Sequence, residues 1–505
     1  MTDRKKVSTG ELLMVGFEGT EIDHSLSRLV LEWQVGGVIL FDRNIRDPEQ
    51  LSELCRRLQE LRRRVANSPL LIAVDQEGGT VARIRQSATV FPGNLALGYA
   101  GRDEDAILQG RITGRDLICL GVNMNLAPVL DLYHPEGSYS IGLRSLGSAP
   151  EKVANLGSAL LSGMQQEGVA ATAKHFPGKG RALRDSHREL PVIECSRENL
   201  MNRDLLPFRS AAAAGVLAMM TSHGAYPSLD GGKVRPATLS PEVMTGVLRR
   251  ELGFGGVLIS DDLGMGAIRD YCPIEEAVQG GVSAGVDVFL LCHSLDQQER
   301  ARAELEKLAA GGGETSRLIE RSTARIAALK SALRPGPALS PPAEDGDQLA
   351  SRIAREAITI SPPAGPGPLL PPRFLLVWFQ PERTVEVESV SGAVGPESYF
   401  RAAGLDPEVV AISLDPGPEE RAAVNSRLTD HQAVLLTSYD AYRFSRQREL
   451  IREVLDRRPG SLLAVLRDPR DGRLFDGVSR LLVTRGAGAY SLRALAEVLA
   501  GKEAE

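Results

Sequence analysis

The first 300 residues of the chain contain eight short apolar segments rich in β-branched residues. They occupy residues 12–17, 36–41, 70–75, 122–131, 169–176, 216–222, 256–262 and 286–292. Between them lie stretches in which apolar and charged residues recur with helical spacing. Strands that are apolar on both faces and alternate with amphipathic helices are typical of a parallel sheet covered by helices. Eight such units in succession predict a (β/α)8 barrel, the TIM barrel.

The composition changes after this predicted barrel. Two stretches rich in proline and glycine, RPGPALSPPAEDG from Arg334 and SPPAGPGPLLPP at 361–372, are unsuited to a packed element. Further apolar segments lie at residues 358–361, 374–379, 409–414, 433–439, 462–469 and 480–486, and they predict a smaller doubly wound α/β domain. We therefore expect a barrel domain at 1–333, a linker region with a possible short strand at 334–372, and a C-terminal α/β domain at 373–505.

The net charge of the chain is −6 and is spread along its whole length. Such weak acidity gives no electrostatic reason to expect nucleic acid or an anionic membrane as a partner. No apolar run approaches the roughly 18 residues that span a bilayer. The apolar run LLMVGF near the N-terminus is too short for an export signal. We therefore expect a cytoplasmic enzyme or binding protein, whose oligomeric state the sequence does not indicate.

The five cysteines lie far apart in the chain and their number is odd. They form no CxxC pair and no other spacing typical of metal ligands. We therefore expect neither a disulfide framework nor a zinc site.

Polar and charged residues follow several of the predicted barrel strands. They are Asp75-Gln76-Glu77-Gly78-Gly79, Asp131, Lys174-His175, Ser222-His223 and Asp261-Asp262. In a (β/α)8 barrel the C-terminal ends of the strands carry the active site. The pair Asp261-Asp262 is the strongest candidate, because adjacent strand residues point to opposite sides and one structural carboxylate does not explain both. The pattern does not show which of the two faces the mouth of the barrel.

A histidine in the loop after the fifth predicted strand is a candidate acid/base. His187 lies in Asp185-Ser186-His187, within the polar loop GKGRALRDSHRE. A carboxylate two residues away can accept a hydrogen bond from one imidazole nitrogen and prepare the other for proton transfer near neutral pH. The glycines Gly178 and Gly180 would let this loop move over a substrate.

Other charged residues could bind a polyhydroxylated ligand at the same rim, or could form ion pairs with one another there. These residues are Asp75, Arg83, Arg144, Lys174 and His175. The sequence Gly264-Met265-Gly266 after the seventh strand is a weaker signal for phosphate binding. It would indicate a phosphosugar or flavin barrel instead.

Four motifs resemble the barrel of glycoside hydrolase family 3, and specifically its β-N-acetylglucosaminidase branch. The motifs are VDQEGG (74–79), APVLD (127–131), KHFPGKG (174–180) with DSH (185–187), and ELGFGGVLISDDLGM (251–265). They follow in the family's order on the predicted strands, and the resemblance covers about residues 10–330. The C-terminal domain is similar in pattern to the second domain of two-domain members.

The resemblance implies roles for particular residues. It makes Asp261 the nucleophile, His187 the acid/base and Asp185 the carboxylate that partners it. It implies that Asp75, Arg83, Arg144, Lys174 and His175 bind the terminal N-acetylglucosamine, and that the enzyme needs no metal and no cofactor. The implied reaction is retaining, through a covalent glycosyl-Asp intermediate. The implied function is exo-acting β-N-acetylglucosaminidase activity on peptidoglycan fragments during cell-wall recycling.

Three residues depart from the usual pattern of this branch. Lys179 stands where a second histidine is common, Leu143 where an acidic residue is common, and Thr80 where an arginine is common. A β-glucosidase of the same family is an alternative, although Asp262 is unlike the tryptophan common after the nucleophile there. A phosphorylase is another, since a histidine acid/base repels phosphate less than a carboxylate does. A non-catalytic sugar-binding protein is the alternative from a different class.

Overall fold

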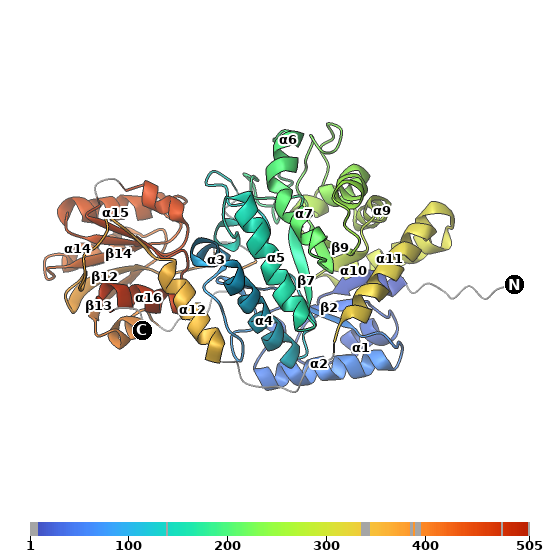
Figure 1. Ribbon diagram of the computed structural model, residues 1–505, viewed down its shortest axis with the longest axis horizontal. Helices are drawn as coiled ribbons and strands as arrows, with labels where there is room; N and C mark the ends of the chain where they lie inside the picture. Colours follow the sequence, from blue (N-terminus) through green and yellow to red (C-terminus); the bar gives the residue numbers. More distant parts are fainter. Residues whose placement is uncertain are drawn as a thin grey trace.

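The computed structural model describes residues 9–137, 140–334, 344–383, 387–388, 395–475 and 478–502. It contains a barrel domain and a second domain built on an open sheet, which lie side by side (Figure 1). In Figure 1 the barrel runs from blue to yellow on the right, and the second domain is orange to red on the left. The predicted fold class is therefore confirmed.

Eight parallel strands close into the barrel. They are β1 (Leu13–Val15), β2 (Gly37–Leu40), β3 (Leu71–Val74), β6 (Met124–Asn125), β7 (Ala170–Phe176), β8 (Ala218–Thr221), β9 (Val257–Asp262) and β10 (Val288–Leu291). Every strand lies within one of the eight segments predicted from the sequence, and β1 pairs with β10 to close the ring. A small antiparallel hairpin, β4 (Gln76–Gly78) and β5 (Val81–Ala82), extends the loop after β3.

Helices surround the barrel and bury their apolar faces against it. The longer ones are α1 (His24–Leu31), α2 (Pro48–Arg63), α4 (Asp103–Cys119), α5 (Pro150–Gln166), α7 (Leu206–Ala213), η6 (Glu242–Glu251), α9 (Ile274–Ala284), α10 (Leu295–Ala310) and α11 (Gly313–Ala332). Shorter helices include α3 (Asn94–Ala100), α6 (Arg197–Asn199) and α8 (Gly266–Arg269). The first turn of η6 shows how the sequence sets such boundaries, because Ser240 Oγ accepts a hydrogen bond from the Val243 amide at 3.2 Å.

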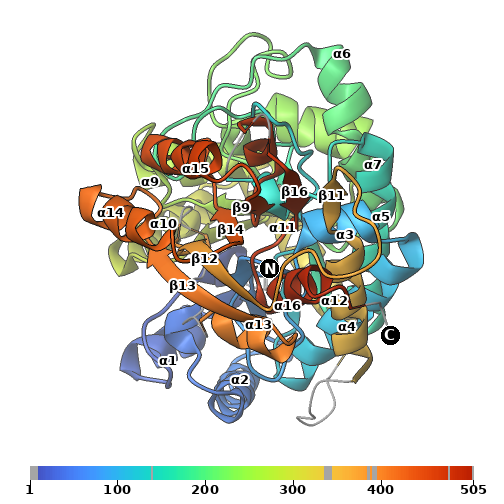
Figure 2. The ribbon, with the colours of Figure 1, turned by 90° about the vertical axis from the view of Figure 1, so that its left-hand side faces the viewer.

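The second domain is a sheet with helices on both faces. Its strand order is β11-β16-β15-β14-β12-β13, and all pairs are parallel except β11 with β16. The strands are β11 (Thr359–Ser361), β12 (Arg373–Phe379), β13 (Asp406–Ile412), β14 (Val434–Ser438), β15 (Leu462–Val465) and β16 (Arg480–Val483). Helices α14 (Pro418–Arg427) and α15 (Ser445–Arg457) cover one face, and α13 (Glu397–Ala402) and α16 (Ala489–Leu499) the other (Figure 2).

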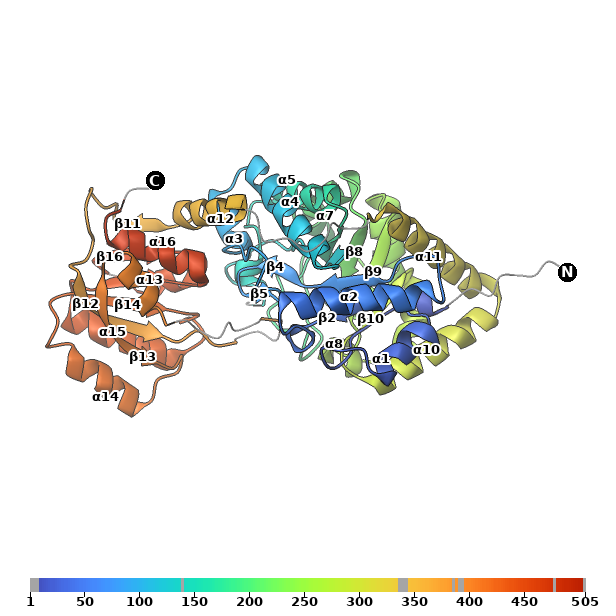
Figure 3. The same ribbon diagram turned by 90° about the horizontal axis from the view of Figure 1, so that it is seen from below.

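The region expected to be a linker contains a helix as well as a strand. The possible short strand at 358–361 is present as β11, whereas α12 (Glu344–Glu356), which begins at the end of the first proline-rich stretch, was not predicted. Leu349, Ala350 and Ile353 are buried at helical spacing. They pack with residues of α3, α4 and α5 in one apolar cluster, and α12 also contacts α16 (Figure 3). The boundaries at 333, 334–372 and 373 remain a prediction.

Hydrogen bonds join the two domains beside the mouth of the barrel. The Tyr133 hydroxyl donates to Asp468 Oδ1 at 2.6 Å, and Arg470 Nη1 donates to the Pro135 carbonyl at 2.8 Å. Arg83 Nη2 donates to the Val387 carbonyl at 2.7 Å. Because Asp468 follows β15, the carboxyl edge of the second sheet faces the carboxyl ends of the barrel strands. Among the described residues, no helix is long and apolar enough to cross a membrane.

Candidate active site

A cavity of about 300 Å³ lies at the carboxyl ends of the barrel strands. Of the eight predicted site residues, seven line it: Asp75, Arg83, Arg144, Lys174, His175, His187 and Asp261. The eighth, Asp185, is hydrogen-bonded to His187. The expectation that the active site lies at the C-terminal ends of the barrel strands therefore located residues that the fold brings together from different strands and the loops that follow them.

The loop after β7 holds the imidazole of His187 against a carboxylate. His187 Nδ1 lies 2.7 Å from Asp185 Oδ1, and the His187 amide donates to the same oxygen at 3.2 Å. Burial opposes ionisation of Asp185, but the hydrogen bond and charge of His187 outweigh it and lower the pKa of Asp185 to about 2. Because an ionised carboxylate has no proton to give, Nδ1 is the donor, and Nε2 is the nitrogen that can exchange a proton.

Asp261 lies at the end of β9 with its side chain 16% exposed. Its Oδ2 is 3.9 Å from Lys179 Nζ, and its Oδ1 accepts from the Asp262 amide at 3.0 Å. Burial raises the pKa of this carboxyl, but the charges of Lys179, His223 and His187 outweigh burial and lower it overall. The Asp261 carboxylate is therefore ionised, half-buried and open to the cavity.

The neighbouring carboxylate, Asp262, is bound quite differently. Its Oδ1 accepts hydrogen bonds from the amides of Gly264 and Cys292, each at 3.1 Å. Burial raises its pKa, which those two hydrogen bonds oppose. The Asp262 carboxylate thus ties the end of β9 to the residue after β10, whereas the Asp261 carboxylate accepts, among the described residues, only from the amide of its neighbour Asp262. The geometry separates two carboxylates that the sequence pattern alone leaves equivalent.

A model of the family described as "Glycosyl hydrolase family 3 N terminal domain" matches residues 4–329. The chain belongs to glycosyl hydrolase family 3. It is therefore a glycoside hydrolase, and the resemblance seen in its motifs is confirmed.

Relatives of this family 3 hydrolase carry related names. A Beta-hexosaminidase from Alkalilimnicola ehrlichii is 42% identical over 287 residues, covering 56% of this chain and 80% of that protein. A Beta-hexosaminidase from Tolumonas auensis is 38% identical over 324 residues, covering 61% and 94%. The structure of a glycoside hydrolase family 3 beta-N-acetylglucosaminidase from Paenibacillus sp. matches with a TM-score of 0.92 and 36% identity, covering 99% of this chain and 97% of that one.

Buried ion pairs organise one wall of the family 3 cavity. Lys174 Nζ lies 2.6 Å from Asp75 Oδ1 and 2.7 Å from Glu77 Oε1. Arg144 donates from Nε and Nη2 to the two Glu77 oxygens, each at 2.8 Å. Burial works against the Glu77 carboxylate, but Arg144 and Lys174 outweigh it and hold its pKa at about 2. Glu77 was not among the predicted site residues, although it lies inside the VDQEGG motif.

Asp131 orients two further residues of the wall. Its Oδ2 is 2.6 Å from His175 Nδ1, and its Oδ1 accepts from the Lys179 amide at 2.7 Å. Asp131 is fully buried, so it acts through His175 and Lys179 and does not itself line the cavity.

Replacing Glu77 with glutamine is expected to destabilise the barrel by about 3 kcal/mol or more, because it leaves two buried cations undercompensated. Glu77 has a pKa lowered from 4.5 to about 2, so its stabilisation is full above 4.5 and is lost as the pH falls towards 2. Urea unfolding of both proteins should therefore show a difference that is large at neutral pH and shrinks in acid. Glu60→Gln, at an exposed ion pair with Arg56, is the control and should change stability by less than about 1 kcal/mol. A stability difference between wild type and Glu77→Gln that did not change with pH would contradict the role of ionised Glu77 as the partner of the two buried cations.

The second domain of this hydrolase also reaches the cavity. Val387 and Glu388 line it, and the Glu388 carboxylate is held by Arg467, with Oε1 at 2.5 Å from Nη2. Arg467 follows β15, and the sequence pattern did not distinguish it from an ordinary residue at the end of a strand. The residues around Glu388 form no motif, so its position depends on domain packing that the sequence pattern does not reveal.

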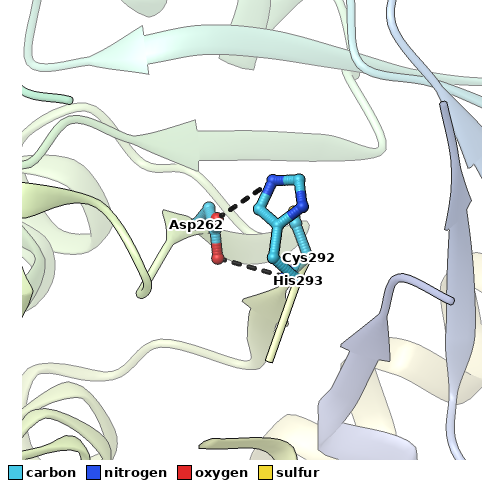
Figure 4. A group of neighbouring side chains, drawn as sticks. All are labelled: Asp262, Cys292 and His293. Carbon is cyan, nitrogen blue, oxygen red and sulfur yellow. Dashed lines mark hydrogen bonds and ion pairs between the residues drawn. The ribbon is translucent and has the colours of Figure 1, made fainter. Parts of the chain in front are cut away.

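Among the described residues, one group has the composition of a metal site. It consists of Asp262, Cys292 and His293, which also line the cavity (Figure 4). The spacing of cysteines did not predict it, because Asp262 belongs to β9 and the other two residues follow β10.

Proposed function

We propose that this glycoside hydrolase is a retaining exo-β-N-acetylglucosaminidase that forms a covalent intermediate on Asp261. The observation that carries the proposal is that an ionised, half-buried carboxylate at the end of β9 and a His–Asp pair after β7 open on one cavity. The names of the relatives and of the Paenibacillus structure support the N-acetylglucosamine specificity. The motifs that resemble the β-N-acetylglucosaminidase branch support cell-wall fragments as the source of substrate.

In the first step, Asp261 attacks the anomeric carbon while the glycosidic bond breaks. His187 gives its Nε2 proton to the departing oxygen, so it enters the step as imidazolium and leaves it as neutral imidazole. The ionised Asp185 stabilises the imidazolium by charge and keeps the other proton on Nδ1. The products of this step are the free aglycone alcohol and a glycosyl ester of Asp261.

In the second step, neutral Nε2 of His187 takes a proton from water as the water oxygen attacks the anomeric carbon. The ester bond to Asp261 breaks and the carboxylate leaves. The histidine is imidazolium again, so the proton consumed in the first step is restored. Two inversions at one carbon give net retention of the β configuration.

The wall of paired charges is proposed to bind the terminal sugar. Asp75, Lys174 and Arg144 present ionised groups to the cavity, and such groups make strong hydrogen bonds to sugar hydroxyls. Arg83 and His175 complete the set that the motifs imply. Because these groups are already paired and buried, they require little reorganisation when a sugar binds.

Phosphorolysis is the second candidate for the reaction. Lys179 and His187 are both placed beside Asp261 and carry no negative charge, so an anionic acceptor would not be repelled there as strongly as by a second carboxylate. Phosphate would then replace water in the second step and give the glycosyl phosphate.

The proposal is tested by release of 4-nitrophenol from 4-nitrophenyl N-acetyl-β-glucosaminide, compared with the β-glucoside, with and without phosphate. We expect turnover of the N-acetyl substrate with little of the glucoside. Faster turnover and a glycosyl phosphate product at saturating phosphate would favour phosphorolysis. Failure of the folded protein to turn over either substrate would overturn the proposed activity.

Replacing Lys179 with methionine is expected to move the acidic limb of the kcat/KM profile to higher pH. The Lys179 charge lowers the pKa of Asp261, and the ionised carboxylate is the reactive form, so activity is lost as pH falls through that pKa. Without the cation, protonation of Asp261 begins at higher pH. Lys233→Met, at an exposed lysine outside the cavity, is the control and should leave the profile in place. Superimposable profiles for all three proteins would show that Lys179 does not act on the nucleophile.

A further inference from the structure

We infer that Asp262, Cys292 and His293 bind one divalent transition-metal ion of the zinc type at the mouth of the barrel, and that the bound ion inhibits the enzyme. The inference goes beyond the proposed function, since metal binding at these residues does not depend on which glycoside is cleaved.

The three side chains come from two neighbouring strands. Asp262 ends β9, and Cys292 and His293 directly follow β10, which pairs with β9 in parallel. One ligand atom from each residue lies within 4.8 Å of the other two, and Asp262 Oδ2 is 4.0 Å from His293 Nε2. Figure 4 shows the imidazole facing the Asp262 carboxylate, with Cys292 beside it.

Sulfur, nitrogen and oxygen donors in one group favour zinc over the alkaline-earth ions, which prefer oxygen alone. Around a tetrahedral zinc ion, with bonds of about 2.0–2.3 Å, neighbouring ligand atoms are about 3.6 Å apart. The group must therefore contract by about 1 Å. The His293 side chain is 63% exposed and can move, whereas Asp262 is held by the two backbone amides and Cys292 is buried.

The surroundings of the group favour a cation. The carboxylates of Asp75 and Asp261 line the same cavity as the three ligands, so they would add negative charge near a bound cation. Three protein ligands leave a fourth position for a water molecule or a substrate atom. All three ligands line the same cavity as Asp261, so an ion held there would obstruct the sugar.

Arg43 opposes this binding. Its Nη1 lies 3.3 Å from His293 Nδ1, while its Nη2 and Nε donate to the carbonyls of Cys292 and Phe17 at 2.7 and 2.9 Å. When Arg43 donates to Nδ1, the neutral imidazole carries its proton on Nε2, the nitrogen that must bind the ion. Metal binding must therefore break the long Arg43–His293 contact, so Arg43 should weaken the site.

Cobalt titration of the full chain tests the site directly, because Co²⁺ bound to a thiolate gives a near-ultraviolet charge-transfer band. We expect the band in the wild-type protein, its loss in Cys292→Ser, and its displacement by Zn²⁺. Cys272→Ser, at a half-buried cysteine outside the cavity, is the matched control and should keep the band. No band in the wild type, or an equal band in Cys292→Ser, would overturn the inference.

Substitution of the exposed ligand His293, and of Arg43, which competes with the ion for His293, gives a second test that does not depend on the buried Cys292. His293→Asn should raise the zinc Kd by at least about tenfold, and Arg43→Met should lower it several-fold. Zinc inhibition should be competitive with substrate and should change in the same ratios. Inhibition that is unchanged in both variants would place the ion elsewhere, for example on Asp261 and His187, and would also overturn the inference. Because the Kd is read from spectra, this result stands even if the proposed N-acetylglucosaminidase activity fails.

Discussion

Replacement of Asp261 by alanine is expected to lower kcat by about three orders of magnitude or more while the protein remains folded. The proposed nucleophile forms the bond that splits one difficult displacement into two, and no other group can supply that bond. Among the hydrogen bonds described, Asp261 Oδ1 accepts only from the neighbouring Asp262 amide, so its removal takes no support from another strand. Lys179 loses a partner at 3.9 Å, which should lower the stability without unfolding the barrel. Initial rates of 4-nitrophenol release and thermal unfolding measure the two effects.

Asp262→Asn is the matched control for this experiment. The amide oxygen can still accept from the Gly264 and Cys292 amides, so the end of β9 should keep its shape and activity should fall far less than in Asp261→Ala. A loss of only a few-fold in Asp261→Ala, with a larger loss in Asp262→Asn, would move the nucleophile to Asp262.

Replacement of His187 by alanine is expected to have an effect that depends on the leaving group. An alkyl or sugar aglycone needs a proton as it departs, so its hydrolysis should slow by about 10²–10⁴-fold. A 4-nitrophenyl aglycone departs as a stable anion, so formation of the glycosyl ester should be affected much less. Attack of water on that ester then becomes slow, because the base is missing.

Azide tests this second step. It attacks without giving up a proton, so it should accelerate turnover of the 4-nitrophenyl substrate by the His187→Ala enzyme and give the β-glycosyl azide. The wild-type enzyme, which activates water itself, should show little acceleration. Equal losses for both aglycones and no effect of azide would assign the acid/base role to another residue.

The barrel could be predicted from the sequence because its strands are buried on both faces and therefore are nearly continuous apolar runs. The helix α12 could not be predicted as readily. Its apolar residues Leu349, Ala350 and Ile353 are few, it lies between two proline-rich stretches, and its stability comes from packing against α3, α4 and α16. Local composition therefore identified the boundary region between the two domains but not the helix α12 within it.

The candidate site was partly predictable for a similar reason. Strand-end residues such as Asp75, Lys174 and Asp261 must meet at one rim once the barrel closes. Glu77 lies within the strand-end segment 75–79 but was not chosen as a site residue, and Glu388 could not be found in this way. Glu77 belongs to a hairpin beyond the strand end. Glu388 lies in the second domain, where Arg467 of the same domain holds its carboxylate, and it reaches the cavity through the packing of that domain against the barrel.

The helix α12 packs against both domains. Its apolar face completes a cluster with barrel helices, Arg352 pairs with Asp105 of the barrel, and Arg355 pairs with Glu497 of α16. Unfolding of either domain would remove the contacts that this domain makes with α12. Thermal or urea denaturation is therefore expected to show a single transition. Folding would then also set the position of Glu388 relative to the barrel rim before any substrate binds.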